Sequence, residues 1–216
     1  MRDRKLILRI LGLFIAMPGY YTLAYLLYAI IKPDQNNPWS TLIYTFSQII
    51  GFIALFYISK REDGGFKSIY IGRLGPKEIT LAISLWLVAF ILWLPINNAL
   101  SSLNISISRW GYSIEGINII PVMIWAMGAA FFEEAFFRGY ALTRLPKVIN
   151  NTTLSVIISV IAFAAIHLRY GLGLFIYMIV WALIISLLFL ATKSTWSCFL
   201  YHAINNLIVN FIIYGG

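Results

Sequence analysis

Residues 172–192 read LGLFIYMIVWALIISLLFLAT, a run that contains no charged residue. A bilayer hydrocarbon core about 30 Å thick is crossed by about 20 mostly apolar residues in a helix. A backbone that faces lipid must satisfy its hydrogen bonds within its own segment, and a helix does so. The sequence therefore predicts a transmembrane helix over this stretch.

The rest of the chain has the same apolar character. Of its 216 residues, 61% are hydrophobic and 11% are charged, and the mean hydropathy is +0.84. A soluble domain is about half apolar and about a quarter charged. The composition excludes a water-soluble globular protein and indicates a chain that uses lipid as its solvent. The single cysteine, Cys198, excludes an internal disulfide and any multi-cysteine metal site.

Six further segments resemble residues 172–192 in length and composition. We predict an all-α fold, a polytopic bundle of about seven transmembrane helices over residues 6–31, 40–59, 79–100, 117–137, 152–168, 172–192 and 195–214. Turns that contain charges, proline or glycine separate these helices, and Pro146 with Asn150-Asn151 separates the fourth from the fifth. Pro18-Gly19 within the first helix predicts a kink.

Lysine and arginine are distributed unevenly between the two sides of this predicted bundle. Thirteen lie in the N-terminal tail or in the second, fourth and sixth loops, whereas Lys32, Arg109 and Arg169 lie on the opposite side. The positive-inside rule then predicts a multi-pass protein of the cell membrane with a cytoplasmic N-terminus. This topology accounts for the net charge of +8, so the expected partner is the lipid bilayer and no nucleic-acid partner is expected.

Two acidic residues and two histidines lie inside the predicted helices. Glu133 and Glu134 are the acidic residues within an apolar segment, and His167 and His202 are the only histidines of the chain. A charge inside the bilayer costs about 2.5–3.5 kcal/mol on insertion scales, so such residues indicate a functional site.

Helical spacing separates the two glutamates by role. Glu134 and Arg138 stand at i, i+4 with the acid first, which is the favourable order for an ion pair. Glu133 is rotated by about 100° around the helix and is left free to face another partner. An alternative for the Glu134–Arg138 pair is an ordinary anchor near the membrane surface.

The same spacing joins each histidine to a neighbour. Phe163 and His167 share a helix face, so the phenyl ring can wall one side of the imidazole, and His202 shares a face with Asn206. If the three helices pack together, one free carboxylate, two imidazoles and one amide converge. Taken singly, each histidine and Asn206 also fits a role as a hydrogen-bonded contact between helices. We interpret Asn205 as a packing or boundary residue, and the Trp and Tyr residues as interfacial belts and packing.

These segments resemble the CPBP family, the CAAX proteases and bacteriocin-processing proteins. The family's Glu-Glu-x-x-x-Arg motif is matched at residues 133–138, its Phe-x-x-x-His motif at 163–167 and its His-x-x-x-Asn motif at 202–206. Each motif is short, but all three occur in order on successive predicted helices and use every histidine of the chain.

The resemblance divides the chain into two regions. Residues 1–116 are predicted to be N-terminal transmembrane helices, and residues 117–216 a CPBP-like catalytic helical core. The last four helices of the bundle would form this core and carry the site.

The resemblance implies an intramembrane endopeptidase that hydrolyses a peptide bond of a membrane-bound or lipidated substrate with a glutamate-activated water. Glu133 would be the general base, and His167 would hold and polarise the water. His202 and Asn206 would stabilise the oxyanion. The supporting residues would be Glu134, Arg138 and Phe163. This mechanism needs no metal and no cofactor.

Three alternatives remain open. A zinc ion held by Glu133, His167 and His202 would leave one position for water, although the chain lacks a His-Glu-x-x-His helix. A non-catalytic bacteriocin-immunity or membrane scaffold protein of the same family would bind a peptide without chemistry. A small transporter would use Glu133 and the histidines as a proton relay, but the sequence lacks evident inverted repeats.

The predicted boundaries place two candidate residues far apart. Glu133 comes near the cytoplasmic end of the fourth helix, whereas His167 comes near the far end of the fifth. If both belong to one site, we expect the fifth helix to start well below Pro146 in the cytoplasm.

Overall fold

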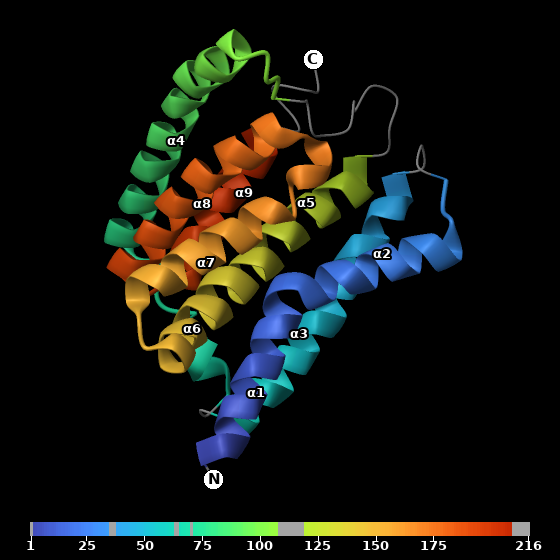
Figure 1. Cartoon of the computed structure of the whole chain (residues 1–216), viewed down its shortest axis with the longest axis vertical. Helices are drawn as coiled ribbons and strands as arrows, with labels where there is room; N and C mark the ends of the chain where they lie inside the picture. Colours follow the sequence, from blue (N-terminus) through green and yellow to red (C-terminus); the bar gives the residue numbers. More distant parts are fainter. Residues whose placement is uncertain (1, 35–37, 63–64, 70, 108–118, 209–216) are drawn as a thin grey trace.

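The computed structural model describes residues 2–34, 38–62, 65–69, 71–107 and 119–208 (Figure 1). These residues form helices and connecting turns but no strand, so the predicted all-α fold is confirmed. The helices are α1 (Arg2–Phe14), α2 (Tyr20–Ile31), α3 (Leu42–Glu62), α4 (Pro76–Ser102), α5 (Ile119–Glu134), α6 (Leu142–Ile149), α7 (Thr152–Ala165), α8 (Leu172–Thr192) and α9 (Thr195–Leu207).

The multi-pass character of the protein is confirmed by the lengths of these helices. Within the described residues, five continuous helical segments are long and apolar enough to cross a bilayer, and α7 is a shorter apolar helix. The five segments are Arg4–Ile31, Trp39–Glu62, Pro76–Ser102, Ile120–Ile149 and Leu172–Thr192. Residues 117–118 and 209–214 of the predicted helices lie outside the described residues.

The predicted end of the fourth helix at residue 137 is wrong. The helix continues from α5 through a π-helical segment, Ala135–Ala141, into α6 and ends at Ile149. Arg138 and Arg144, which the sequence suggested for a loop, are fully buried and paired with glutamates inside the bundle. Pro146 lies inside α6, and Asn150 ends the helix in a left-handed conformation (φ 53°).

The longer fourth helix explains how Glu133 and His167 can belong to one site. Helix α7 begins at Thr152, as predicted, directly after the turn that follows the end of α6 at Ile149. The number of residues from Glu133 to the turn is nearly the same as the number from the turn to His167. At about 1.5 Å of rise per residue, both lie roughly 23 Å from the turn. They therefore reach the same height in the bundle because the fourth helix is longer than predicted.

The first predicted helix bends at its proline. Pro18 lies within a π-helical turn, Ile15–Gly19, that joins α1 to α2. Because proline cannot donate the backbone hydrogen bond and its ring clashes with the preceding turn, a kink is expected here. Figure 1 shows α2 turned sharply away from the direction of α1.

The helices pack around a buried centre. Helix α5 packs against α3 on one side and α9 on the other, while α8 contacts both α7 and α9. Helix α4 covers α8 and α9 at the outer edge of the molecule (Figure 1). The core at the centre contains Phe136, Phe137, Trp181 and Tyr201, each at most 1% exposed.

A buried ion pair ties the N-terminal helices to this arrangement. The Nε of Arg144 donates to Glu62 Oε1 at 2.8 Å, and both side chains are fully buried. Arg144 also donates to the Ser68 hydroxyl at 2.6 Å. Removal of one partner from such a pair leaves an uncompensated charge, so the contact fixes the end of α3 against the start of α6.

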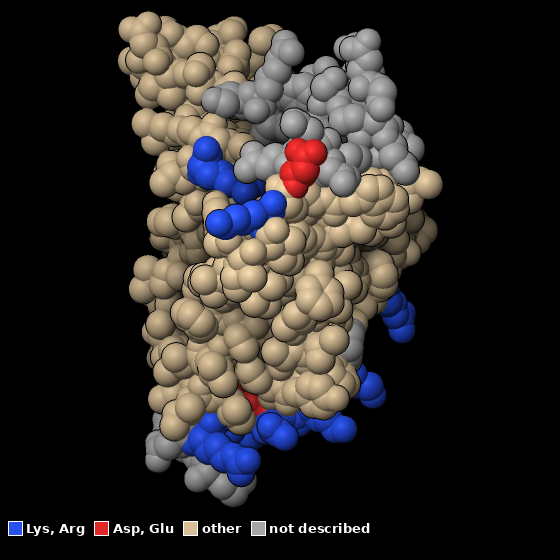
Figure 2. Space-filling model, turned by 90° about the vertical axis from the view of Figure 1, so that its right-hand side faces the viewer, with Lys and Arg blue, Asp and Glu red and all other residues tan. Residues whose placement is uncertain are grey.

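Charged side chains gather at the ends of the molecule. Figure 2 shows Lys and Arg clustered at the lower end and along the lower right edge, a broad central area without charges, and a few charged groups above that area. The lower end is where α1 begins and where α3 and α6 finish. A broad uncharged surface bordered by charged groups is the pattern expected for a membrane-embedded bundle.

Candidate active site

Glu133 and Glu134 end helix α5, directly before the π-helical segment. Both side chains are buried, with 4% and 0% of their surfaces exposed. A π-helical turn inside an α-helix is often found at functional sites. Here the turn carries Arg138, whose Nη1 lies 3.2 Å from Glu134 Oε1. The ion pair predicted from the i, i+4 spacing is therefore present.

Arg138 is held on three sides. Besides Glu134, its Nη2 donates to the carbonyl of Ala182 on α8 at 3.2 Å. Its guanidinium lies 4.6 Å from the centre of the Phe163 ring. A desolvated cation over an aromatic face is stabilised by roughly 2 kcal/mol. The arginine thus links α5, α7 and α8 at the level of the candidate site.

Glu133 has a different environment from its neighbour. Its Oε1 accepts a hydrogen bond of 2.9 Å from the hydroxyl of Tyr44 on α3. Within the part of the chain that the structure describes, this is the only hydrogen-bond partner of Glu133, and no arginine pairs with it. Among these described residues, the carboxylate is therefore positioned by a neutral group and forms no salt bridge.

His202 is oriented by Glu134. The Nδ1 of His202 lies 2.8 Å from Glu134 Oε1, the same oxygen that Arg138 contacts. The indole of Trp181 packs edge-on against the imidazole, with ring centres 4.8 Å apart. A carboxylate on one ring nitrogen fixes the orientation of a histidine and leaves the other nitrogen, Nε2, for the reaction.

His167 is oriented by a backbone carbonyl. It follows the last turn of α7, and its Nδ1 lies 3.1 Å from the oxygen of Phe163. Because a carbonyl can only accept, Nδ1 carries the proton of this bond and, in a neutral ring, Nε2 carries the lone pair. The Phe163 ring lies 5.1 Å from the imidazole, on the side that the spacing predicts.

Phe163 joins the separate parts of the site. Its ring stacks on Trp181 with centres 5.4 Å apart and lies 6.2 Å from the ring of His202. It also touches Arg138 and His167, as described above. One buried phenyl group therefore sets the spacing between both imidazoles and the guanidinium.

Asn206 lies one turn beyond His202 on α9. Its side-chain nitrogen donates to the carbonyl of Ala126 on α5 at 2.9 Å. This bond joins α9 to the helix that carries Glu133. Asn205, which the sequence suggested for packing, also lines the cavity beside the site.

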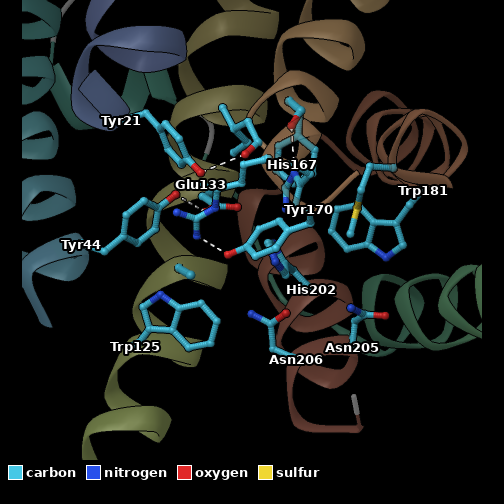
Figure 3. A pocket seen from close by; sticks show the side chains of 15 residues that line it. Tyr21, Tyr44, Trp125, Glu133, His167, Tyr170, Trp181, His202, Asn205 and Asn206 are labelled. Carbon is cyan, nitrogen blue, oxygen red and sulfur yellow. Dashed lines mark hydrogen bonds between the residues drawn. The ribbon is translucent and has the colours of Figure 1, made fainter. Parts of the chain in front are cut away.

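A small cavity lies between these side chains (Figure 3). Its volume is about 40 Å³, and a buried water requires about 10–15 Å³ on this measure, so it has room for a few water molecules. The motif residues that line it are Glu133, Phe163, His167, His202 and Asn206. The structure thus brings together the carboxylate, both imidazoles and the amide that the sequence proposed, whereas Glu134 and Arg138 lie behind them.

Several lining residues were not predicted as site residues. They include Tyr21, Tyr44, Trp125, Arg169 and Tyr170. The assignment of tyrosine and tryptophan to interfacial belts is therefore incomplete. A signal existed on α3, where Thr45, Ser47 and Gln48 form a buried polar patch next to Tyr44. Polar residues inside a membrane helix usually face the bundle interior, so α3 could have been assigned to the site.

The arrangement of the acidic and imidazole groups can be compared with that of a metal site. Among the residues that the structure describes, no group of three or more His, Cys, Asp or Glu side chains is arranged to hold a metal ion. Of the three suggested zinc ligands, Glu133 accepts from Tyr44, and His202 contacts Glu134 through Nδ1 and keeps Nε2 for another partner.

Comparison with known families gives a match over the C-terminal part of the chain. Residues 115–208 match the family described as type II CAAX prenyl endopeptidase Rce1-like. This range contains all three motifs and the described helices from α5 to α9. The resemblance to the CPBP proteases that the motifs indicated is thereby confirmed. No curated protein and no solved structure matches the chain.

Proposed function

Because residues 115–208 match the Rce1-like family of type II CAAX prenyl endopeptidases, we propose that this membrane protein is an intramembrane endopeptidase whose Glu133 activates the hydrolytic water. One observation carries the proposal. Glu133 is buried, has one neutral hydrogen-bond partner among the described residues and lines a cavity of water size next to two imidazoles. A general base needs this access to water and freedom from a salt bridge.

The proposed first step is the attack of water on the scissile carbonyl carbon. Glu133 takes a proton from the water as the new carbon–oxygen bond forms and the carbonyl oxygen becomes an oxyanion. His167 contributes Nε2 as an acceptor that holds the water, because its Nδ1 is occupied by the Phe163 carbonyl. Fixing the water beside the base removes much of the entropic cost of the reaction.

The second step is the collapse of the tetrahedral intermediate. The carbon–nitrogen bond breaks, and the proton held by Glu133 passes to the departing amine. His202 and Asn206 are proposed to stabilise the oxyanion, since both line the cavity. For His202 this role requires a proton on Nε2 as well as the one that Nδ1 donates to Glu134. Donors in a dry site stabilise developing charge strongly, and the loss of one such donor costs about 10²–10³ in rate.

Glu134, Arg138 and Phe163 are proposed to support the site and not to react. Glu134 holds both Arg138 and His202, and Arg138 is fixed between Phe163 and the Ala182 carbonyl. Such a network holds the catalytic imidazole in one orientation. Of the two adjacent glutamates, Glu133 is therefore the proposed base, and Glu134 holds the neighbouring side chains in place.

We further propose that the N-terminus lies in the cytoplasm. The start of α1, the ends of α3, α6 and α8, and the turn before α4 lie at one end of the bundle. Lys60, Arg61, Lys67, Lys147 and Lys193 belong to these segments. The excess of basic residues at this end supports the orientation, even though Arg138 and Arg144 are buried and no longer count as loop charges.

The substrate of the proposed reaction is a membrane-bound or lipidated peptide. The candidate base lies near the middle of the apolar helix Ile120–Ile149, so a substrate must reach it within the depth of the bilayer. A peptide with an apolar segment or a lipid chain is concentrated at this depth.

Cleavage of a library of prenylated and hydrophobic peptides tests the proposal. Purified wild type in detergent should release products that mass spectrometry maps to one bond, and Glu133→Gln should release none. Glu78→Gln is the matched control, because it makes the same chemical change at a helix N-terminus where glutamine also serves as a capping residue. No cleavage by wild type would favour the non-catalytic immunity or scaffold protein. Equal cleavage by Glu133→Gln would refute the role of this residue.

A further inference from the structure

A second and larger cavity adjoins the candidate active site. It has a volume of about 780 Å³, within the range of about 300–1,000 Å³ found for ligand pockets. Tyr21, Tyr44, Arg169 and Tyr170 line both this groove and the small cavity that contains Glu133. The groove therefore leads to the candidate base, and these four side chains stand at the junction.

The groove has aromatic walls and two cations. Tyr25 and Tyr28 from α2 line it farther from the active site, and Lys32 lies beyond the end of the same helix. Arg169 is at the inner end, two residues after His167. No acidic side chain is among the residues that line the groove in the described part of the chain.

Arg169 is held in place by aromatic contacts. Its guanidinium lies 4.4 Å from the centre of the Tyr170 ring and 5.7 Å from that of Tyr21, and it donates to the Tyr170 hydroxyl. Tyr21 is itself anchored, because its hydroxyl donates to the carbonyl of Ile166 at 2.9 Å. Gly171 allows the turn that presents this segment, since its φ of 106° is rarely accessible to other residues.

The arginines of this bundle differ in their partners. Arg138 and Arg144 each pair with a buried glutamate. Arg169 forms no ion pair with any carboxylate that the structure describes, although it lines the same cavity as Glu133. A guanidinium has five N–H donors in a fork that matches a carboxylate. Among the described residues, the Tyr170 hydroxyl accepts from Arg169, and most of its other N–H groups have no acceptor there.

We propose that Arg169 binds a carboxylate of the substrate peptide in this groove and thereby determines which bond reaches Glu133. The proposal rests on the proposed protease function and adds a specificity-determining residue to it. The peptide lies along the tyrosine-lined groove, and Lys32 adds positive charge at the outer end. The carboxylate is either the C-terminus of the peptide or an acidic side chain near the cut.

Binding can be measured apart from cleavage by using the Glu133→Gln protein. Three farnesylated fluorescent peptides serve as probes: one with a free C-terminus, its C-terminal amide, and the amide with one acidic residue near the C-terminus. Either carboxylate-bearing peptide should bind at least about tenfold more tightly than the plain amide, because a charge-assisted bidentate contact is lost in the latter. The carboxylate-bearing peptide that binds more tightly than the plain amide identifies the source of the carboxylate.

A second substitution then assigns this preference to Arg169. Adding Arg169→Gln should remove the preference, Arg169→Lys should keep part of it, and Arg73→Gln, an exposed cation near the opposite end, should leave it unchanged. Equal binding of all three peptides, or a preference that survives Arg169→Gln, would overturn the proposal. So would a failure of all three to bind.

Cleavage by the wild type separates this inference from the proposed function. If wild type cuts all three peptides with equal kcat/KM, the protease function stands and the role of Arg169 is refuted. If the peptides bind with the expected preference but are not cut, the carboxylate site stands and the protease function is refuted.

Discussion

Adjacent glutamates on one helix have different partners in this protein. Glu134 accepts from Arg138 and His202, whereas Glu133 accepts from the Tyr44 hydroxyl alone among the described residues. A residue step of about 100° on the helix is sufficient to separate them. The geometry therefore distinguishes a group that positions other side chains from a group that is available to water.

Tyr44 provides a test of how the candidate base is positioned. Tyr44→Phe removes the hydroxyl that donates to Glu133 at 2.9 Å and keeps the ring. Loss of this positioning contact should lower kcat by about tenfold or more. A hydrogen bond to a charged group contributes about 1.5–3 kcal/mol to stability, so Tm should also fall by several degrees, and kcat is compared well below Tm. Tyr57→Phe, at a side chain 56% exposed, is the control. An unchanged kcat in Tyr44→Phe would show that the hydroxyl does not position the base.

The sequence could predict the motif residues but not their second partners. The spacing of Glu134 and Arg138 predicts their ion pair, because both lie on one helix. The contacts Tyr44–Glu133 and His202–Glu134 join residues 89 and 68 positions apart in the chain. Such contacts depend on the packing of helices, which the periodicity of a single sequence does not determine.

At the level of single elements, the π-helical segment Ala135–Ala141 sets the path of the longest helix. Gly139 in this segment lies against the turn around Ile69, where an added Cβ would come within 2.6 Å of the Ile69 side chain and 2.8 Å of its carbonyl oxygen. A neighbouring backbone atom cannot move away easily. The absence of a side chain at this position therefore permits the close packing of the segment.

Gly139→Ala should lower the stability of the protein. Overpacking of a well-packed site costs about 1–3 kcal/mol, so Tm should fall measurably in detergent. Gly128→Ala is the comparison, because its Cβ would meet the Thr45 methyl group at 3.2 Å, a side-chain contact with more room to adjust. A thermal melt that shows no loss of Tm in Gly139→Ala, or a larger loss in Gly128→Ala, would contradict this account.

The helix boundaries that the sequence predicted well are those set by local chemistry. Residues 172–192 form α8 over the full predicted range, because uncharged residues continue to its end and Lys193 follows in a left-handed conformation. The fourth helix was predicted too short, because Arg138 and Arg144 appeared to mark its exit from the membrane. Their charges are neutralised inside the bundle by distant or adjacent glutamates, and only the fold reveals this.

At the scale of the whole molecule, the excess of basic residues at the end where α1 begins predicts the orientation of the protein in the membrane. Replacement of the buried Cys198 by serine gives a background without cysteine, into which Lys60→Cys or Ser102→Cys is introduced. These positions lie at opposite ends of the bundle, at the end of α3 and of α4. A membrane-impermeant maleimide applied to intact cells should label the cysteine at position 102, and label the one at position 60 only after permeabilisation. The reverse pattern would contradict a cytoplasmic N-terminus.

Both halves of the chain contribute to the candidate site. Tyr21 and Tyr44 from the N-terminal helices face the same cavity as the motif residues of the C-terminal region. The family match begins at residue 115 and does not include these helices. The motif residues that line the cavity could therefore be named from the sequence, while the lining residues from the N-terminal helices could not.

The central claim is that Glu133 and a water molecule hydrolyse the peptide bond without a metal ion. The most direct measurement is the initial rate of peptide cleavage by wild type and by Glu133→Gln, each with and without a strong zinc chelator. We predict that the substitution lowers the rate by at least about 10³-fold, as for the loss of a principal catalytic group, while the chelator leaves the wild-type rate unchanged. A wild-type rate that the chelator abolishes and zinc restores, or a Glu133→Gln enzyme that remains active, would contradict the claim.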